Sequence, residues 1–268
     1  MSRMFSRFGY ACLAAAMALA GCAVPVEEDG KTVESVASRS VLRVGLTPNY
    51  PPVIDRIDGE FAGIEIDLAN EAAKGLDKRF QFIELPFEQL IPALTSGEID
   101  IIMSGMSITA ERKQKIAFTE PYLHIGQMAV TRIAEVQHLG SLTALLNAPI
   151  TAGFEPGTTG ETFVKTNMKN AKPMSVPSID AAVDALRSRQ IDVFIHDAPT
   201  AWRIGSDAAY QDLIGLYWPL TDEYLGWGVR KSDQELRAAL SDQITKMTAD
   251  GRLSRITRNW IKVRVEVR

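Results

Sequence analysis

From Val41 onward, segments with the hydrophobic pattern of β-strands alternate with segments that have the pattern of helices. In the first part of the chain the strand patterns cover residues 41–46, 80–85 and 99–103, and the helix patterns cover 66–76 and 87–94. Helices that alternate with strands along a chain cover the faces of a shared sheet. The order therefore predicts an open α/β sheet.

A second set of alternating segments begins near Gln127. Strand patterns cover residues 128–131, 150–154, 191–195 and 225–230, and helix patterns cover 142–146, 158–168, 179–189, 234–247 and 253–260. This length of chain can form one α/β domain or two smaller lobes, and periodicity alone does not decide between them.

A short stretch of small and hydroxyl-bearing residues follows the strand pattern at 99–103. It contains Ser104, Gly105 and Ser107, and a turn of such residues can direct backbone N–H and C=O groups at a ligand. Arg112 follows on a polar run, and a guanidinium can hold a carboxylate through two parallel hydrogen bonds. The pattern predicts a site for an acid group, and the alternative is a plain turn with a solvated arginine.

Residues 97–122, GEIDIIMSGMSITAERKQKIAFTEPY, closely resemble the signature of the family 3 solute-binding proteins, which are the extracytoplasmic receptors of polar amino acid ABC transporters. The resemblance extends from about Val41 to Trp260. It implies the two-lobe, type II periplasmic-binding-protein fold, an α/β class with a ligand cleft between open sheets. Lobe 1 would contain residues 41–124 plus 226–268, and lobe 2 would contain residues 125–225. The implied partners are an amino acid and an ABC permease, with no cofactor.

Two aromatic residues match positions that flank the ligand side chain in this family, Tyr50 after the first strand and Phe87 at the start of a helix pattern. Without the resemblance, Tyr50 can equally be a core residue at a turn, and Phe87 can be a hydrophobic staple for its own helix. Glu65 and Asp67 lie at the start of another helix pattern. We expect both acids to be structural, because acids at a helix N-terminus face the positive end of its dipole.

The second half of the chain offers a group for each end of an amino acid. Thr158 and Thr159 open a helix pattern, and free N–H groups at a helix N-terminus form an anion site. Asp197 matches the carboxylate that binds the ligand ammonium in the family, although an ordinary helix cap is the alternative. The resemblance thus implies a zwitterion site with Arg112 and the amides of Ser107 and Thr159 at the α-carboxylate. Asp197 and carbonyls near Ser104 would hold the α-ammonium.

The side chain of the ligand is less constrained. Receptors for cationic amino acids often carry an acid after the first strand, where this chain has Thr47. Glu155 can supply a negative charge instead if it points into the cleft, which would favour arginine or lysine. A loop glutamate that faces water is the alternative.

Signatures of an enzyme are weak. The three histidines, His124, His138 and His196, lack the spacing of metal ligands, and no P-loop, complete G-x-G-x-x-G or G-x-S-x-G motif is present. The same fold also hosts cyclohexadienyl dehydratases, for which Glu155 is the evident candidate to protonate a leaving hydroxyl. A third possibility is a lipid-anchored sensor with a separate membrane partner. The presence of Asp197 favours an amino acid receptor that is not an enzyme.

The first 21 residues have the pattern of a signal peptide, in which Arg3 and Arg7 precede an apolar run too short to span a bilayer. The residues LAGC that end at Cys22 resemble a bacterial lipobox, in which the cysteine becomes acylated. Residues 22–40 are polar, and we expect them to form a tether. The sequence therefore predicts an extracytoplasmic protein that is anchored to a membrane by lipid.

Cleavage before Cys22 would change the formal net charge from −4 to −6, because residues 1–21 contain two arginines and no acid. No basic stripe suggests binding to nucleic acid. No cysteine follows Cys22, so the folded part can hold no disulfide. We expect the protein to be a monomer.

Overall fold

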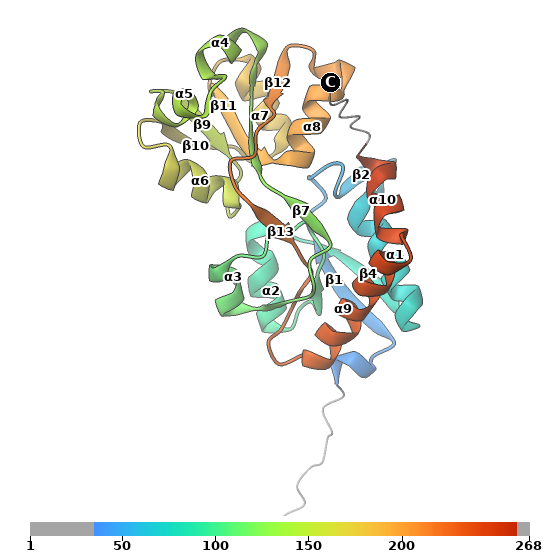
Figure 1. Ribbon diagram of the computed structural model, residues 1–268. Coiled ribbons are helices and arrows are strands. Elements are labelled where there is room, and N and C mark those ends of the chain that lie inside the picture. Colours follow the sequence, from blue (N-terminus) through green and yellow to red (C-terminus); the bar gives the residue numbers. More distant parts are fainter. Residues whose placement is uncertain (1–34, 262–268) are drawn as a thin grey trace, which may run out of the picture. The chain divides into compact units, whose positions relative to one another are not determined.

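The computed structural model describes residues 35–261, so the predicted signal peptide, Cys22 and most of the expected tether lie outside it. Within this range the chain forms two five-stranded sheets (Figure 1). The first sheet has the order β4 (Arg79–Glu84), β1 (Val41–Leu46), β5 (Ile101–Ile102), β14 (Gly228–Val229) and β6 (Ala117–Phe118). Strands β4, β1 and β5 are parallel, whereas β14 is antiparallel to its neighbours.

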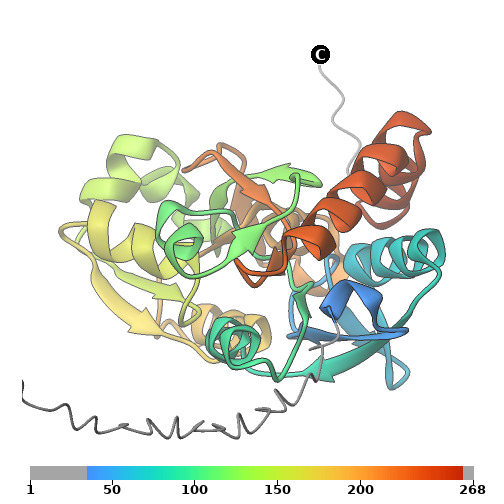
Figure 2. The same ribbon diagram turned by 90° about the horizontal axis from the view of Figure 1, so that it is seen from below.

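The helices associated with the first sheet come from both ends of the chain. They are α1 (Ile64–Leu76), α2 (Leu90–Ser96), α3 (Ala110–Lys115), α9 (Gln234–Ala249) and α10 (Arg252–Trp260). Short 3₁₀ turns at Val36–Ser38 and Phe87–Gln89 and a hairpin of β2 (Asp55–Ile57) and β3 (Glu60–Ala62) complete this part. Helices α9 and α10 pack beside α1, as both ribbon views show (Figures 1 and 2).

The second sheet contains only residues from the middle of the chain. Its order is β10 (Lys172–Ser175), β9 (Thr151–Phe154), β11 (Val193–Asp197), β8 (Gln127–Arg132) and β12 (Leu213–Leu216). Its helices are α4 (Val136–Leu139), α5 (Leu142–Asn147), α6 (Thr159–Asn167), α7 (Ile179–Arg187) and α8 (Ala198–Ser206), with 3₁₀ turns at Ile133–Glu135 and Ala208–Tyr210. Strands β10, β9 and β11 are parallel, and β8 is antiparallel to β11.

Two segments connect the sheets, and each contains one strand of an antiparallel pair, β7 (Leu123–Ile125) with β13 (Glu223–Leu225). Both run between the two sheets in Figure 1. The strand predicted at 225–230 is in fact two short strands, β13 and β14, because Gly226 and Trp227 separate them. The predicted α/β architecture with open sheets is confirmed.

Helix α1 shows how the sequence builds the core of the first sheet. Ile64, Leu68 and Ala72 follow helical spacing, and none is exposed to solvent. They pack with the buried indole of Trp227 in one hydrophobic cluster. Burial of a leucine side chain contributes about 1.5–3 kcal/mol, so this face holds the helix against the sheet. The helix begins after Gly63, whose φ of 126° is a conformation that other residues rarely adopt.

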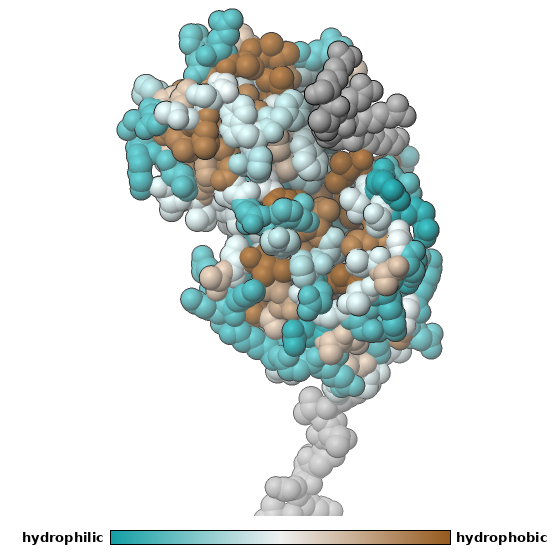
Figure 3. Space-filling model, in the orientation of Figure 1, coloured by the Kyte–Doolittle hydropathy of each residue, from teal (hydrophilic) through white to brown (hydrophobic). Residues whose placement is uncertain are grey.

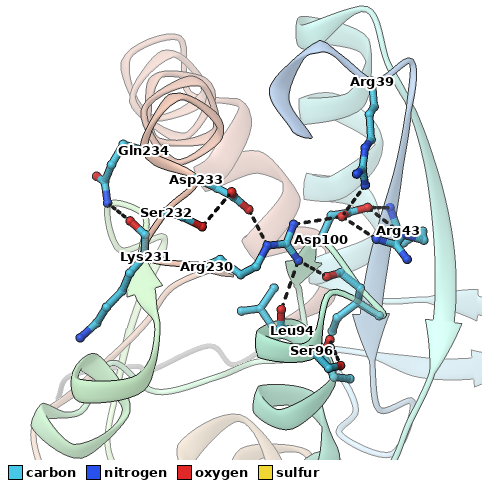
Figure 4. Close-up of polar contacts among 12 residues, drawn as sticks. Arg39, Arg43, Leu94, Ser96, Asp100, Arg230, Lys231, Ser232, Asp233 and Gln234 are labelled. Atoms are coloured by element: carbon cyan, nitrogen blue, oxygen red, sulfur yellow. Dashed lines mark hydrogen bonds and ion pairs between the residues drawn. The ribbon is translucent and has the colours of Figure 1, made fainter. Parts of the chain in front are cut away.

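A buried carboxylate, Asp100, binds the segment that follows β14 to the first sheet. The Asp100 side chain is fully buried and accepts hydrogen bonds from Arg43 Nε at 3.0 Å and from Arg39 Nη1 and Arg230 Nη2, each at 3.1 Å (Figure 4). Arg230 directly follows β14 and also pairs with Asp233 at 2.8 Å. A buried charge is stable only when it is paired and hydrogen-bonded, and these arginines provide both.

Several elements differ from the prediction. Strand β10 was not predicted. It contains Pro173, which is tolerated because β10 lies at the edge of its sheet. Helix α8 was not predicted either. Its Pro199 lies in the first turn, where proline fits a helix. Val36 and Ala37, expected in the tether, belong to a 3₁₀ turn. This turn packs against the hydrophobic cluster that contains Trp227.

The surface of the described part is mostly hydrophilic on the lower part of the face in Figure 3, and hydrophobic residues gather nearer the crossover strands and on the part above them. Between residues 35 and 261, no helix combines the length and the apolar character needed to cross a membrane.

Candidate ligand-binding site

The residues predicted to bind a ligand meet at one cavity of about 280 Å³. All ten of them line it, namely Tyr50, Phe87, Ser104, Gly105, Ser107, Arg112, Glu155, Thr158, Thr159 and Asp197. Segments that follow β1, β4 and β5 approach the cavity from the first sheet, and segments at the ends of β9 and β11 approach it from the second. Carboxyl ends of parallel strands lie at the same edge of a sheet, which is why residues distant in sequence converge here.

Arg112 lies in α3 with 9% of its surface exposed. The Thr109 side chain caps this helix by accepting a hydrogen bond from the Arg112 N–H at 3.1 Å. The guanidinium donates to the carbonyl of Ser107 at 2.9 Å and to that of Gly157 at 3.0 Å, so it bridges the two halves of the site. Its carbon also lies 5.3 Å from the centre of the Phe87 ring, a cation–π contact. Burial lowers the pKa of Arg112.

The N-terminus of α6 forms the facing wall. Thr158 caps the helix, because its hydroxyl accepts from the Glu161 N–H at 3.2 Å and donates to the Glu155 carbonyl at 2.7 Å. The Gly157 N–H is already bonded to the Glu161 carboxylate at 2.7 Å. Thr159 begins the helix, and its N–H has no intrahelical partner. Of the N–H groups expected to form the anion site, that of Gly157 is therefore already used, and that of Thr159 in the first turn of the helix remains.

Asp197 ends β11 and is 8% exposed. Its Oδ2 accepts from the Tyr50 hydroxyl at 2.6 Å, and its Oδ1 accepts from the Gln127 side-chain amide. It precedes α8 but its side chain makes no capping bond, so the helix-cap alternative is wrong. Burial raises the pKa of Asp197, although neighbouring His196 and the two hydrogen bonds oppose that shift.

Tyr50 lies both in a core cluster and at the wall of the cavity. It is 9% exposed and belongs to a core cluster, yet its hydroxyl reaches across to Asp197. Gly105 makes room for the ring, because a Cβ there would lie 2.5 Å from the Tyr50 Cε1 atom, and its φ of 62° also favours glycine. Burial and the nearby Asp197 charge raise the pKa of the Tyr50 hydroxyl well above its usual range.

Glu155 does not face water, because only 15% of its side chain is exposed. One carboxylate oxygen lies 2.8 Å from His196 Nε2, and the other lies 3.5 Å from the Asn49 side-chain amide. Burial lowers the pKa of His196, but the hydrogen bond and charge of Glu155, with Asp197 beside it, outweigh burial and raise the pKa overall. His196 Nδ1 is buried without a hydrogen-bond partner among the described residues.

Thr47, considered above only for ligand selectivity, also lines the cavity. Sequence reasoning missed several further lining residues, namely Asn49, Pro86, Glu88, Gln127, Pro156, Pro177 and His196. Gln127 gave no local signal, because it matters only through its position opposite Asp197 in the antiparallel β8–β11 pair. His196 could have been included for its place directly before Asp197. The part of the chain that the structure describes contains no cluster of three or more His, Cys, Asp or Glu suited to a metal ion.

Comparisons with known proteins find relatives that cover most of this chain. The family model for bacterial extracellular solute-binding proteins, family 3, matches residues 42–263. The histidine-binding periplasmic protein of Salmonella typhimurium is 31% identical over 233 residues, which cover 82% of this chain and 86% of that protein. Cyclohexadienyl dehydratase of Pseudomonas aeruginosa is 29% identical, with 70% of this chain and 69% of the enzyme covered.

An ancestral arginine-binding protein, solved with arginine bound, has a similar structure. It is 30% identical, the TM-score is 0.77, and the match covers 83% of this chain and 98% of that one. The predicted type II fold class is confirmed by this likeness.

Proposed function

The chain belongs to family 3 of the bacterial extracellular solute-binding proteins, and on this basis we propose that it delivers an amino acid to an ABC importer. The observation that carries the proposal is the cavity that Arg112 and Asp197 both line, Arg112 from α3 beside the first sheet and Asp197 from the end of β11 in the second sheet. One positive and one negative side chain, both at most 9% exposed, complement the two charges that every free amino acid carries.

The α-carboxylate binds at Arg112 and the first turn of α6. The guanidinium is planar and held by two carbonyls, so its remaining N–H groups have a fixed direction. The Thr159 amide adds a donor at the positive end of the helix dipole. Ser107, whose carbonyl already orients the guanidinium, adds its amide from the opposite wall.

The α-ammonium binds at Asp197. Gln127 and Tyr50 hold the two carboxylate oxygens, which keeps the negative charge in place inside a buried site. Hydrogen bonds to a charged group contribute about 1.5–3 kcal/mol each, so this end supplies a large share of affinity. The carbonyls near Ser104 complete the ammonium pocket.

The side chain of the ligand lies between Tyr50 and Phe87 and extends toward Glu155. We propose that Glu155 accepts from a cationic or amide group at the end of that side chain, with arginine and lysine as the first candidates. Its low exposure supports this role, while His196 competes for the same carboxylate. Replacement Glu155→Gln should weaken arginine binding and leave glutamine binding within threefold.

The control is Glu88→Gln, since Glu88 also lines the cavity but is exposed to solvent. This variant should change the affinity for neither arginine nor glutamine. Equal selectivity among arginine, glutamine and glutamate in the Glu155 variant would remove that residue from the specificity pocket.

The two sheets with their helices act as lobes that close over the ligand. Lobe 1 comprises residues 41–124 plus 226–268, and lobe 2 comprises residues 125–225. The two separate five-stranded sheets support this division. Three contacts cross between the lobes: Tyr50 to Asp197, Arg112 to Gly157 and Asn49 to Glu155. A ligand that contacts both lobes stabilises the closed state by its differential affinity for that state.

A thermal-shift screen over the twenty amino acids, followed by calorimetry, tests the ligand class. A ligand present at 100 times its Kd adds about 2.7 kcal/mol to the stability of the folded protein. Prephenate belongs in the same screen, with product detection. Absence of any amino acid effect, together with consumption of prephenate, would replace the receptor by a dehydratase.

We propose that the mature protein begins at an acylated Cys22 and works at a membrane surface as a lipid-anchored monomer. The lipobox-like LAGC after a short apolar run supports this, and the residue lies outside the described range. Cys22→Ser should release a folded protein from membranes, whereas Cys12→Ser, in the expected signal peptide, should leave anchoring intact. Intact mass is the measurement, and an unmodified N-terminus in the wild type would contradict the anchor.

A further inference from the structure

Glu65 is a fully buried acid in the first turn of α1 that does not itself line the ligand cavity. A favourable helix dipole alone would not require burial, because an exposed acid at the same position gains that interaction as well. The surroundings of the carboxylate indicate a more specific role.

Three donors converge on the Glu65 carboxylate from three separate segments. Its Oε1 accepts from the Gly105 N–H at 2.8 Å and from the Tyr122 hydroxyl at 2.6 Å. Its Oε2 accepts from the Trp227 indole N–H at 2.7 Å. Burial raises the pKa of Glu65, while these three hydrogen bonds oppose that shift by stabilising the ionised form.

Each donor stands at a place that matters for ligand capture. Gly105 is in the turn that lines the cavity and lies under the Tyr50 ring. Tyr122 directly precedes the crossover strand β7, and Trp227 follows the crossover strand β13 by two residues. These strands run between the two sheets (Figure 1).

The cavity turn is also bonded directly to β13 and its flank. The Gly226 N–H donates to the Met106 carbonyl at 3.2 Å, and the Ile108 N–H donates to the Tyr224 carbonyl at 2.8 Å. The turn and the crossover strands therefore belong to one hydrogen-bonded network, in which the Glu65 carboxylate accepts from Gly105, Tyr122 and Trp227.

We propose that Glu65 is a positioning residue. Its carboxylate holds the Ser104–Ser107 turn against the ends of both crossover strands, so that the turn keeps a fixed position relative to them. This inference rests on the proposed amino acid receptor function. Without the carboxylate, the Gly105 amide and the carbonyls beside it would lose their fixed direction, and closure would no longer bring them to the ligand in register.

The test compares Glu65→Gln with Asp67→Asn. Asp67 lies two residues farther along the same helix, and its carboxylate also accepts an indole N–H, that of Trp260 at 2.7 Å. Among the described residues its carboxylate has no hydrogen bond to the cavity turn, unlike that of Glu65, so it is a matched control for loss of an acid and of an indole bond. The carboxamide at position 65 must oppose one of its donors with an N–H, whichever way it is turned.

Calorimetry with L-arginine and L-glutamine is the first readout. Glu65→Gln should weaken the better ligand at least about tenfold, while Asp67→Asn should change its affinity less than threefold. The second readout needs no ligand. The Gly105 amide resonance should shift upfield in the proton dimension and exchange faster with solvent in Glu65→Gln only.

If Glu65→Gln does not fold, Tyr122→Phe removes one donor and leaves the charge, and the same two readouts apply. Unchanged Gly105 protection together with unchanged affinity would overturn the proposal, as would equal losses in the two acid variants. A wild type that binds no amino acid would refute the receptor function, and the Gly105 amide would still decide the role of Glu65.

Discussion

Replacement of Asp197 by asparagine should separate ligand affinity from protein stability. The asparagine has nearly the same shape, and its carbonyl can still accept the hydrogen bond from the Tyr50 hydroxyl. Gln127 can adapt to the new amide, because its Oε1 is buried without a partner among the described residues and can turn to accept an N–H. The pocket therefore keeps its packing and loses only its negative charge.

The expected loss of affinity follows from leaving an ammonium without its counter-charge in a site that is 8% exposed. Removal of one partner of a buried pair typically costs about 3–5 kcal/mol. With tenfold per 1.4 kcal/mol, Kd should rise by about two to three and a half orders of magnitude.

The free energy of unfolding of the ligand-free protein should increase or stay the same in Asp197→Asn. Because the pKa of Asp197 is raised in the folded protein, the ionised carboxylate destabilises the fold at neutral pH. Asp197→Asn removes that penalty. The advantage should be present at pH 7 and should vanish as pH falls through the raised folded pKa toward 3.8, the usual value for an aspartate.

Calorimetry with the ligand from the screen and urea unfolding of the free protein measure the two effects. Asp207→Asn is the control, because this exposed acid caps a 3₁₀ turn, a role that asparagine performs equally well. Affinity within threefold of the wild type would refute the ammonium assignment. A clear loss of stability in the free variant would instead show that the charge is structural.

Three further predictions concern other charged groups. Arg112→Lys keeps the charge but loses the planar two-carbonyl contact, so calorimetry should show at least about tenfold weaker binding, and an unchanged Kd would exclude Arg112 from the site. Because the pKa of His196 is raised, its pairing with Glu155 stabilises the fold fully below about pH 6.5, and this stabilisation is lost as pH rises through the folded pKa. His196→Gln should flatten the decline in the free energy of unfolding, measured by urea titrations between pH 6 and 9. Asp100→Asn should destabilise the protein by about 3 kcal/mol in urea, toward the lower end for a buried pair because its arginines are partly exposed. A change below about 1 kcal/mol would contradict a role in holding Arg230, the residue after β14, against the first sheet.

The sequence determined the local elements wherever one period dominated. The spacing of Ile66, Ala69 and Ala73 predicted α1, although the helix starts two residues earlier at Ile64. Strand β1 matched its prediction because a run of mostly apolar residues, 41–46, precedes a proline-stiffened loop. The turn after β5 and the residues at the ends of β9 and β11 could also be predicted to line a site, because each lies within a short motif of adjacent residues.

Only the tertiary structure decided how the candidate residues are used. Strand pairing alone places Gln127 against Asp197, 70 residues away in sequence, and no local pattern encodes that register. The three donors on Glu65 likewise come from distant segments, so its role could not be distinguished from a helix-dipole acid by sequence. Charges and hydrogen bonds act over a few ångströms in space, and only the folded chain fixes which groups lie that close.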